Sequence, residues 1–196
     1  MIAIIDFGEE HTSTLVSMLE KITSDFIVTS NEVEICRADK VILSAYGDAS
    51  WGIKKLHLLN LFTVLRIIRK PMLGIDMGMH LMCNNSGEDH YSCLGIFQAS
   101  GIQFDYSAGG KNKGFSKILF NPDNLLFKNI GVDDQFYFEH NCYIPRNDLT
   151  TSVVDSKEII ISSSLEKGNA FAVQFRPEES GDAGKKVLMN FLEFVH

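Results

Sequence analysis

The pattern of apolar and polar residues predicts short buried strands that alternate with amphipathic helices in the first half of the chain. Four continuous apolar runs have the composition of strands buried on both faces. They span Ile2 to Ile5, Phe26 to Thr29, Val41 to Leu43 and Met72 to Ile75. Apolar residues recur three and four positions apart in Thr12 to Ile22 and Lys54 to Arg69, which predicts helices. This alternation favours an α/β fold, with a mostly parallel sheet and helices on both faces.

The second half of the chain predicts antiparallel strands, several loops and a closing helix. The expected strands are Ile96 to Phe104, Phe115 to Phe120, Phe136 to His140, Ile159 to Ser163 and Ala170 to Phe175. The other expected elements are a turn or short helix at Leu125 to Phe127, loops at Asn84 to Cys93 and Ser107 to Lys113, and a helix at Ala183 to Phe194. No repeat, low-complexity segment or domain boundary interrupts the pattern, so we expect residues 1–196 to form one domain.

The stretch from Gly74 to Gly78 has the pattern of a nucleophile elbow, a sharp turn that joins a strand to a helix. Its glycines allow the turn because they carry no Cβ. The central side chain then faces the first backbone N–H groups of the helix. Acyl-transfer enzymes usually have Ser or Cys at this central position, whereas this chain has Asp76.

Ligand sites in parallel sheets lie beyond the carboxyl ends of the strands. We therefore expect one crevice where three strand ends meet. These ends are Asp6 to Gly8, Ser44 to Gly47 and Gly74 to Asp76.

Composition and charge narrow the functional classes. The chain has 196 residues, 45% of them hydrophobic, and no apolar run reaches the roughly 20 residues of a membrane-spanning helix. A net charge of −7 argues against a nucleic-acid partner. The first residues are strand-like and lack the basic region of a signal peptide, so we expect a soluble, cytoplasmic protein. Without CxxC spacing the cysteines are expected to be reduced, with Cys83 and Cys142 as packing residues.

Five motifs match one family in order and spacing. Residues 74–80, Gly-Ile-Asp-Met-Gly-Met-His, are similar to an elbow that reads G-I-C-L-G-M-Q, and residues 173–178, Val-Gln-Phe-Arg-Pro-Glu, are similar to Q-F-H-P-E. Residues 1–8, 111–116 and 137–143 resemble stretches that read roughly I-D-Y-G-M-G-N, H-M-G-W-N and Y-F-V-H-S-Y. Together they resemble class I (triad-type) glutamine amidotransferases, which are flavodoxin-like α/β proteins, and especially the glutaminase subunit of imidazole glycerol phosphate synthase.

The resemblance implies a reaction. In that family a cysteine attacks the carboxamide of glutamine, a histidine is the base, a glutamate orients the histidine, and ammonia passes to a (β/α)8-barrel cyclase subunit. The corresponding positions here are Asp76, Arg176 and Glu178. The resemblance implies no cofactor and no metal. Histidine biosynthesis is the usual setting, although a paralogue with these changes could serve another route, such as amination of a surface sugar.

Positions that would hold the substrate also depart from the family. The oxyanion loop P-G-V-G reads Ser44-Ala-Tyr46-Gly47, and the elbow glutamine is His80. Tyr46 stands in place of a valine and is expected to narrow the cleft, while Met77 follows Asp76 at the start of the helix.

Two further stretches have alternative interpretations. His140 matches a family histidine near the cyclase-facing side, so either a partner interface or a core position is expected. Residues 9–11, Glu-Glu-His, stand in place of M-G-N. We interpret them as the cap region of a helix rather than as a metal site.

Asp76 and Arg176 are incompatible with the Cys-His chemistry of the family. Arginine does not exchange its proton near neutral pH, and a carboxylate is a weaker nucleophile than a thiolate. A carboxylate and a guanidinium can however pair bidentately. Our hypothesis is that Asp76 and Arg176 form a salt bridge, with Glu178 on the other side of Arg176, that replaces the catalytic pair as a structural plug.

Three functions remain open. The first is a catalytically silent subunit that binds a barrel-type cyclase or synthase and stabilises or regulates it, with ammonia taken from solution. The second is an enzyme, either a cryptic glutaminase or a hydrolase with Asp76 as nucleophile and His80 or His140 as base. The third is a stand-alone binding protein. An exposed apolar patch around the crevice mouth and His140 would favour the first, and a deep open pocket with Asp76 and His80 unpaired would favour the second. A closed crevice with a paired Asp76 and no large patch would argue against all but a structural role.

Overall fold

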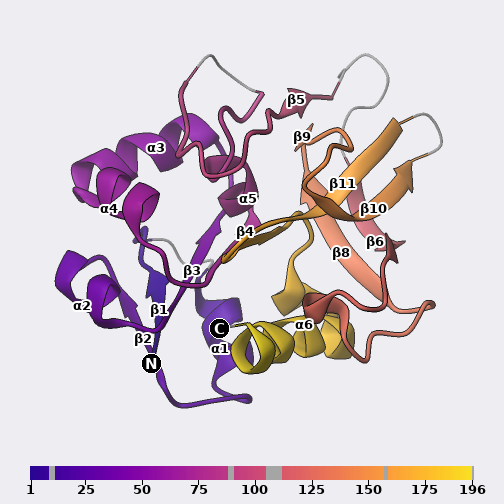
Figure 1. Cartoon of the computed structure of the whole chain (residues 1–196), viewed down its shortest axis with the longest axis horizontal. Coiled ribbons are helices and arrows are strands. Elements are labelled where there is room, and N and C mark those ends of the chain that lie inside the picture. Colours follow the sequence, from indigo (N-terminus) through magenta and orange to yellow (C-terminus); the bar gives the residue numbers. More distant parts are fainter. Residues whose placement is uncertain (9–11, 88–90, 105–111, 157–158, 196) are drawn as a thin grey trace.

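An eight-stranded mixed sheet forms the centre of the computed structural model, which describes residues 1–8, 12–87, 91–104, 112–156 and 159–195 (Figure 1). Its parallel strands are, in order, β2 (Phe26–Thr29), β1 (Ile2–Ile5), β3 (Lys40–Ala45), β4 (Met72–Asp76) and β12 (Ala170–Val173). The sheet continues antiparallel through β11 (Ile159–Lys167), β10 (Thr150–Ser156) and β7 (Leu119–Phe120). The predicted α/β class, with a parallel first half and an antiparallel second half, is confirmed.

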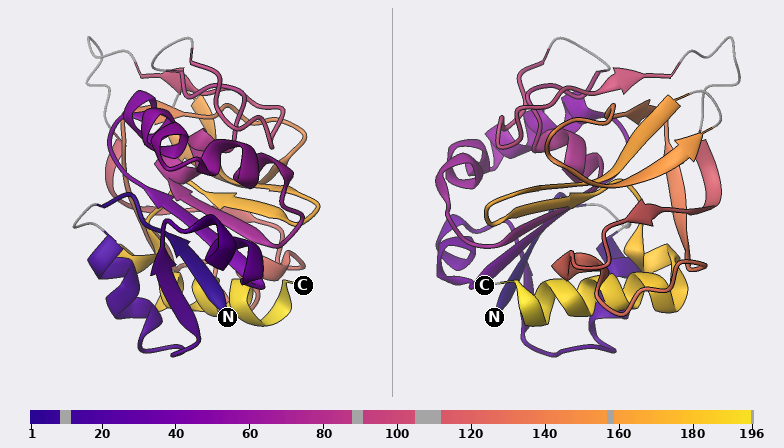
Figure 2. Two further views of the ribbon diagram at one scale, coloured as in Figure 1. Left: turned by 90° about the vertical axis from the view of Figure 1, so that its left-hand side faces the viewer. Right: turned by 45° about the vertical axis from the view of Figure 1, so that its right-hand side comes forward.

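Helices cover both faces of the sheet because side chains alternate between two cores. In β1, Ala3 and Ile5 belong to one core, and Ile2 and Ile4 belong to the other. Side chains of α2 (Glu32–Arg37), α3 (Ala49–Leu58), α4 (Leu61–Ile67) and α5 (Met77–Leu81) complete the first core. The second is completed by α1 (Thr12–Leu19) and α6 (Gly181–Phe194), and Figure 2 shows the two layers on opposite sides of the sheet.

Two small ribbons flank the antiparallel half. Strand β6 (Asn112–Lys117) pairs with β8 (Gln135–His140), and β5 (Ile102–Gln103) pairs with β9 (Cys142–Tyr143). Among the described residues there are two 3-10 turns, η2 (Leu125–Phe127), as predicted, and η3 (Pro177–Glu179).

The predicted helices needed three corrections in the first half. The helix expected from Thr12 ends at Leu19 rather than Ile22. The helix expected over Lys54 to Arg69 is two helices, because Asn60 adopts a left-handed φ of 58° that interrupts the helical hydrogen bonds. An unpredicted helix, α2, begins where the Asn31 side chain accepts hydrogen bonds from the N–H groups of residues 33 and 34.

In the second half, the predicted strand over Ile96 to Phe104 was wrong for most of its length. Residues 96 and 97 donate their N–H groups to the Met82 carbonyl instead, so the segment wraps around α5 and only β5 is extended. Strand β10 was not predicted, and the strand expected over Phe115 to Phe120 divides between two sheets. Strand β12 is parallel to β4 as well as antiparallel to β11. Residues 107–111 of the expected surface loop, and residues 9–11, lie outside the described residues, while the last two residues of that loop, 112 and 113, belong to strand β6 instead.

Candidate functional site

Asp76 occupies a strained turn between β4 and α5. Its φ of 53° and ψ of −115° are rare for a residue with a side chain. Both glycines of the motif are needed for close packing. A Cβ on Gly78 would lie 1.9 Å from the carbonyl oxygen of Leu43, and a Cβ on Gly74 would lie 2.9 Å from that of Gly78. The turn therefore has the geometry predicted for a nucleophile elbow.

A cavity of about 300 Å³ lies beyond the ends of the three central strands, β3, β4 and β12. Asp76 is the last residue of β4 and Met77 the first of α5, while Gly47 lies beyond β3 and both Gln174 and Arg176 lie beyond β12. All five residues line the cavity. The expectation that residues 6–8 would also meet there was wrong, since they do not line it and β3 separates β1 from β4 in the sheet.

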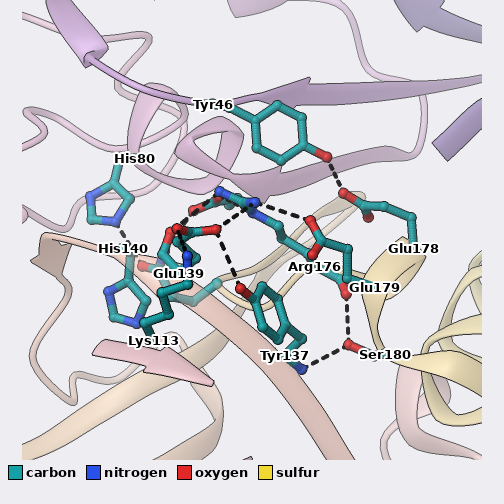
Figure 3. Close-up of polar contacts among 12 residues, drawn as sticks. Tyr46, His80, Lys113, Tyr137, Glu139, His140, Arg176, Glu178, Glu179 and Ser180 are labelled. Atoms are coloured by element: carbon teal, nitrogen blue, oxygen red, sulfur yellow. Dashed lines mark hydrogen bonds and ion pairs between the residues drawn. The ribbon is translucent and has the colours of Figure 1, made fainter. Parts of the chain in front are cut away.

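Arg176 and Asp76 form the ion pair that the sequence predicted. The Nε atom of Arg176 donates to Oδ2 of Asp76 at 2.8 Å, and the side chains are 13% and 5% exposed. The prediction that Glu178 would contact the other side of the guanidinium was wrong. Its Nη1 donates to Glu139 at 3.1 Å and to Glu179 at 3.0 Å, whereas Glu178 forms no ion pair with it (Figure 3).

Glu178 is instead held by Tyr46. The hydroxyl of Tyr46 donates to Oε1 of Glu178, and the ring of Tyr46 faces the guanidinium of Arg176, with 4.5 Å between Cζ of the arginine and the ring centre (Figure 3). Burial raises the pKa values of both the phenol and the carboxyl group. Tyr46 therefore links Glu178 and Arg176 through a hydrogen bond and a cation–π contact.

His80 reaches Asp76 through a glutamine. Nε2 of His80 lies 2.7 Å from Oε1 of Gln174, and Nε2 of Gln174 donates to Oδ1 of Asp76 at 3.3 Å. Since the amide oxygen can only accept, the histidine nitrogen is the donor. Burial lowers the pKa of His80, which favours this neutral form.

The charge state of Asp76 reflects opposing effects. Burial raises its pKa to about 7, while Arg176 favours the ionised form and Glu178 and Glu139 oppose it. The buried carboxyl group is thus expected to titrate near neutral pH, with the ion pair complete above that pH.

His140 is a wall residue of the cavity rather than an open-surface residue. It is 5% exposed, its Nδ1 donates to the carbonyl of Cys142 at 2.6 Å, and it packs near the Phe104 and Phe138 rings. Burial lowers its pKa to about 4. Of the predicted packing cysteines, Cys83 is fully buried, while Cys142 is buried and also lines the cavity.

The ribbon of β6 and β8 holds Arg176 from the other side. The N–H group of Arg176 donates to the Tyr137 carbonyl at 2.9 Å, and Glu139 accepts from Lys113 at 2.6 Å as well as from Arg176. Sequence reasoning missed Glu139. The signal was available, because Glu139 stands where the resembling motif Y-F-V-H has valine.

The remaining predicted site residue, Ser44, is buried near the end of β3 and pairs in register with Ile75.

Three carboxylates, those of Asp48, Asp76 and Glu139, and one guanidinium line the cavity. No group of three or more His, Cys, Asp or Glu side chains that could hold a metal ion occurs within the described ranges. All four cysteines are free thiols. No helix in the part of the chain that the structure describes is long and apolar enough to span a membrane.

Comparison with known proteins identifies relatives along nearly the whole chain. The model of the family described as glutamine amidotransferase class-I matches residues 3–194. The chain is 35% identical over 198 residues to imidazole glycerol phosphate synthase subunit HisH of Buchnera aphidicola subsp. Schizaphis graminum, covering 98% of each chain. It is 33% identical over 203 residues to subunit HisH 2 of Methanococcus maripaludis, covering 98% of this chain and 99% of that protein.

Solved structures share the fold at lower sequence identity. A glutamine amidotransferase from Thermotoga maritima aligns with a TM-score of 0.64 and 16% identity, covering 98% of this chain and 96% of that one. The glutaminase domain of Trypanosoma brucei CTPS, solved with bound acivicin, aligns with a TM-score of 0.68 and 15% identity, covering 97% and 91%.

Proposed function

Because the chain belongs to the class I glutamine amidotransferase family, we propose that it is a glutaminase-like subunit that no longer hydrolyses glutamine and acts through a partner. The observation that carries this proposal is the 2.8 Å ion pair between Asp76 and Arg176. These residues stand at the nucleophile and base positions of the family motifs. Arginine stays protonated at neutral pH and cannot accept the proton of a nucleophile.

Asp76 is also poorly suited to act as a nucleophile. Both of its carboxylate oxygens accept hydrogen bonds, one from Arg176 and one from Gln174. An attacking oxygen would have to give up one of these bonds inside a buried site. Such pairing stabilises a carboxylate and lowers its reactivity, which supports a structural role for this group.

The partner in this proposal is a (β/α)8-barrel cyclase or synthase that takes ammonia from solution. The HisH relatives are named as subunits of a synthase. Apolar side chains are exposed on the two ribbons next to the cavity, with Phe115 58% exposed on β6 and Ile102 45% exposed on β5. Exposed apolar groups beside a cavity are typical of protein interfaces, so we propose that the partner docks over these ribbons and over β8, which carries His140.

We further propose that residues 1–196 form one domain and that the protein works in the cytoplasm within a heterodimer. Histidine biosynthesis is the route suggested by the resemblance, and amination of another metabolite such as a surface sugar is the alternative.

A hydrolase that uses Asp76 is the second candidate, favoured by the cavity of about 300 Å³ that Asp76 lines. It would need a base. His80 is bonded to Gln174, and His140 donates to the Cys142 carbonyl, with a pKa lowered by burial to about 4. A histidine with so low a pKa is a weak base near neutral pH.

The deciding experiment measures glutamate released from glutamine by the purified chain, alone and with its cognate cyclase. We expect no release by the native chain and measurable release by the Asp76→Cys/Arg176→His double variant. Asp76→Cys/Arg176→Ala is the matched control, because it has the thiol without the base. Native activity that Asp76→Ala abolishes would refute the proposal and favour the hydrolase.

A further inference from the structure

A second cavity lies at the opposite end of β4 from Asp76. It has a volume of about 440 Å³ and is bounded by the end of α4, the start of β4 and the turn between β11 and β12. Its apolar wall includes Leu65 and Met72, which are 0% and 3% exposed. A concave, partly apolar cavity of this size is typical of small-molecule sites.

The polar wall of this cavity carries only positive charge. Arg66, Arg69, Lys70 and Lys167 line it, and no carboxylate is among its lining residues in the described part of the chain. The whole chain has 18 Lys and Arg residues against 25 Asp and Glu, so a cavity lined by four cations and by no described acid departs from its overall balance, although Asp39, outside the lining, interacts with the charge of Lys70. None of the four forms an ion pair with a described residue.

Neutral groups hold these cations in place without cancelling their charge. The ammonium group of Lys70 donates to the carbonyls of residues 36 and 38, and that of Lys167 donates to the carbonyl of residue 96 at 3.0 Å. The guanidinium of Arg66 lies 5.6 Å from the centre of the Phe62 ring. The backbone of Arg69 is fixed by a 2.9 Å bond from Asn169 to its carbonyl. The end of helix α4 contributes a partial negative charge of about half a unit, which is small beside four full positive charges.

From this arrangement we infer that the cavity binds the phosphate group of a small metabolite, with the rest of the ligand against the apolar wall. Arginine guanidinium groups match phosphate oxygens bidentately, and lysines act as point charges around them. A phosphate monoester carries about two negative charges at neutral pH, which a site with four cations can neutralise. The volume suits a sugar phosphate or a mononucleotide better than an acidic protein segment. This inference does not rest on the proposed function, because the cavity shares no lining residue with the one at Asp76.

Calorimetric titration of the full chain at low salt tests the inference, with AMP and inorganic pyrophosphate as probes and adenosine as the uncharged comparison. We expect both anions to bind and adenosine not to bind. Arg66→Ala/Arg69→Ala should weaken AMP binding about tenfold or more, since each arginine contributes charge-assisted hydrogen bonds. Arg66→Lys/Arg69→Lys should keep part of the affinity.

The matched control is Arg146→Ala/Lys185→Ala, which removes two positive charges outside the cavity and should change AMP binding by less than about twofold. Thermal unfolding of each variant verifies that it is folded. Equal weakening in both double variants would mean general charge attraction and would overturn the inference. It would also be overturned if neither anion bound the native chain, or if a hexaglutamate peptide bound and pyrophosphate did not.

Discussion

Nε of Arg176 lies 2.8 Å from Oδ2 of Asp76, and the same guanidinium also contacts the carboxylates of Glu139 and Glu179. Arg176 is therefore shared by three carboxylates, of which Asp76 is the most buried and Glu139 also pairs with Lys113. The stability of this arrangement depends on the arginine more than on any single acid.

Replacing Arg176 with methionine should lower the free energy of unfolding by about 3 kcal/mol at pH 8, because the buried Asp76 loses its counter-charge. Chemical unfolding measures the change. In the Asp76→Asn/Arg176→Met double variant the loss should be smaller than the sum of the two single losses, because no buried charge is left unpaired. Additive losses would show that the two side chains are not coupled.

The titration of Asp76 predicts a pH dependence of stability. Its pKa rises from 3.8 to about 7 on folding, so the native state binds more protons between these values. Ionisation of Asp76 therefore lowers stability as the pH rises from about 4 to about 7, by at most about 4 kcal/mol. Asp76→Asn removes this contribution, and the stability of the native chain minus that of the variant should fall across this window.

The titration of His140 changes stability with pH in the opposite direction, but it does not disturb the comparison of the native chain with Asp76→Asn. Its pKa falls from 6.5 to about 4 on folding, so its contribution to stability increases as the pH rises through that interval. Since both proteins contain His140, its effect cancels in the difference. A difference that stays constant between pH 4 and pH 7 would contradict a raised pKa for Asp76.

Gly78→Ala should destabilise the fold by about 3 kcal/mol or more, because the added methyl group would lie 1.9 Å from the carbonyl oxygen of Leu43 and neither backbone can move far. Thermal or urea unfolding measures the effect. Gly131→Ala is the control, since its nearest neighbour would be a side-chain atom of Asp134 at 3.5 Å. Equal stabilities of the two variants would mean that the elbow can widen.

Tyr46→Phe removes the donor to Glu178 while keeping the ring against the guanidinium of Arg176. We expect a loss of about 1–3 kcal/mol near pH 8, because a buried carboxylate is left without its hydrogen bond. The pKa of Glu178, already raised by burial, should rise further, so the loss should shrink as the pH falls and Glu178 becomes protonated. If Tyr46→Phe lowered the free energy of unfolding equally at pH 8 and at low pH, the loss would come from packing of the phenol rather than from its hydrogen bond to Glu178.

Sequence patterns predicted the buried strands well because their signal is local. Ile2–Ile5 and Phe26–Thr29 have the predicted bounds, and the elbow follows from two glycines whose close contacts exclude any side chain. The break at Asn60 and the irregular path of residues 96–101 could not be predicted in this way. The break depends on one backbone angle of Asn60. The path of residues 96–101 depends on hydrogen bonds to the end of α5, and no apolar pattern in the sequence encodes those bonds.

The candidate site was predictable in part for the same reason. Complementary charges at two motif positions suggested the pair of Asp76 and Arg176. The partners of Glu178 and Arg176 depend on which way side chains leave β8 and the loop after β3, and no sequence period encodes those directions. Comparing each motif letter by letter would have drawn attention to Glu139, an acid in place of valine beside a new arginine.

The parallel pairing of β4 with β12 has a consequence for how the chain folds. It joins segments so far apart that Asp76 and Arg176 are separated by 100 residues. Closing a loop of that length costs entropy before any contact is gained, and such long-range pairings fold slowly. During synthesis, β4 keeps an apolar edge open to other chains until residues 170–173 emerge. We therefore expect completion of the site to be the slow step of folding and the stage most exposed to aggregation.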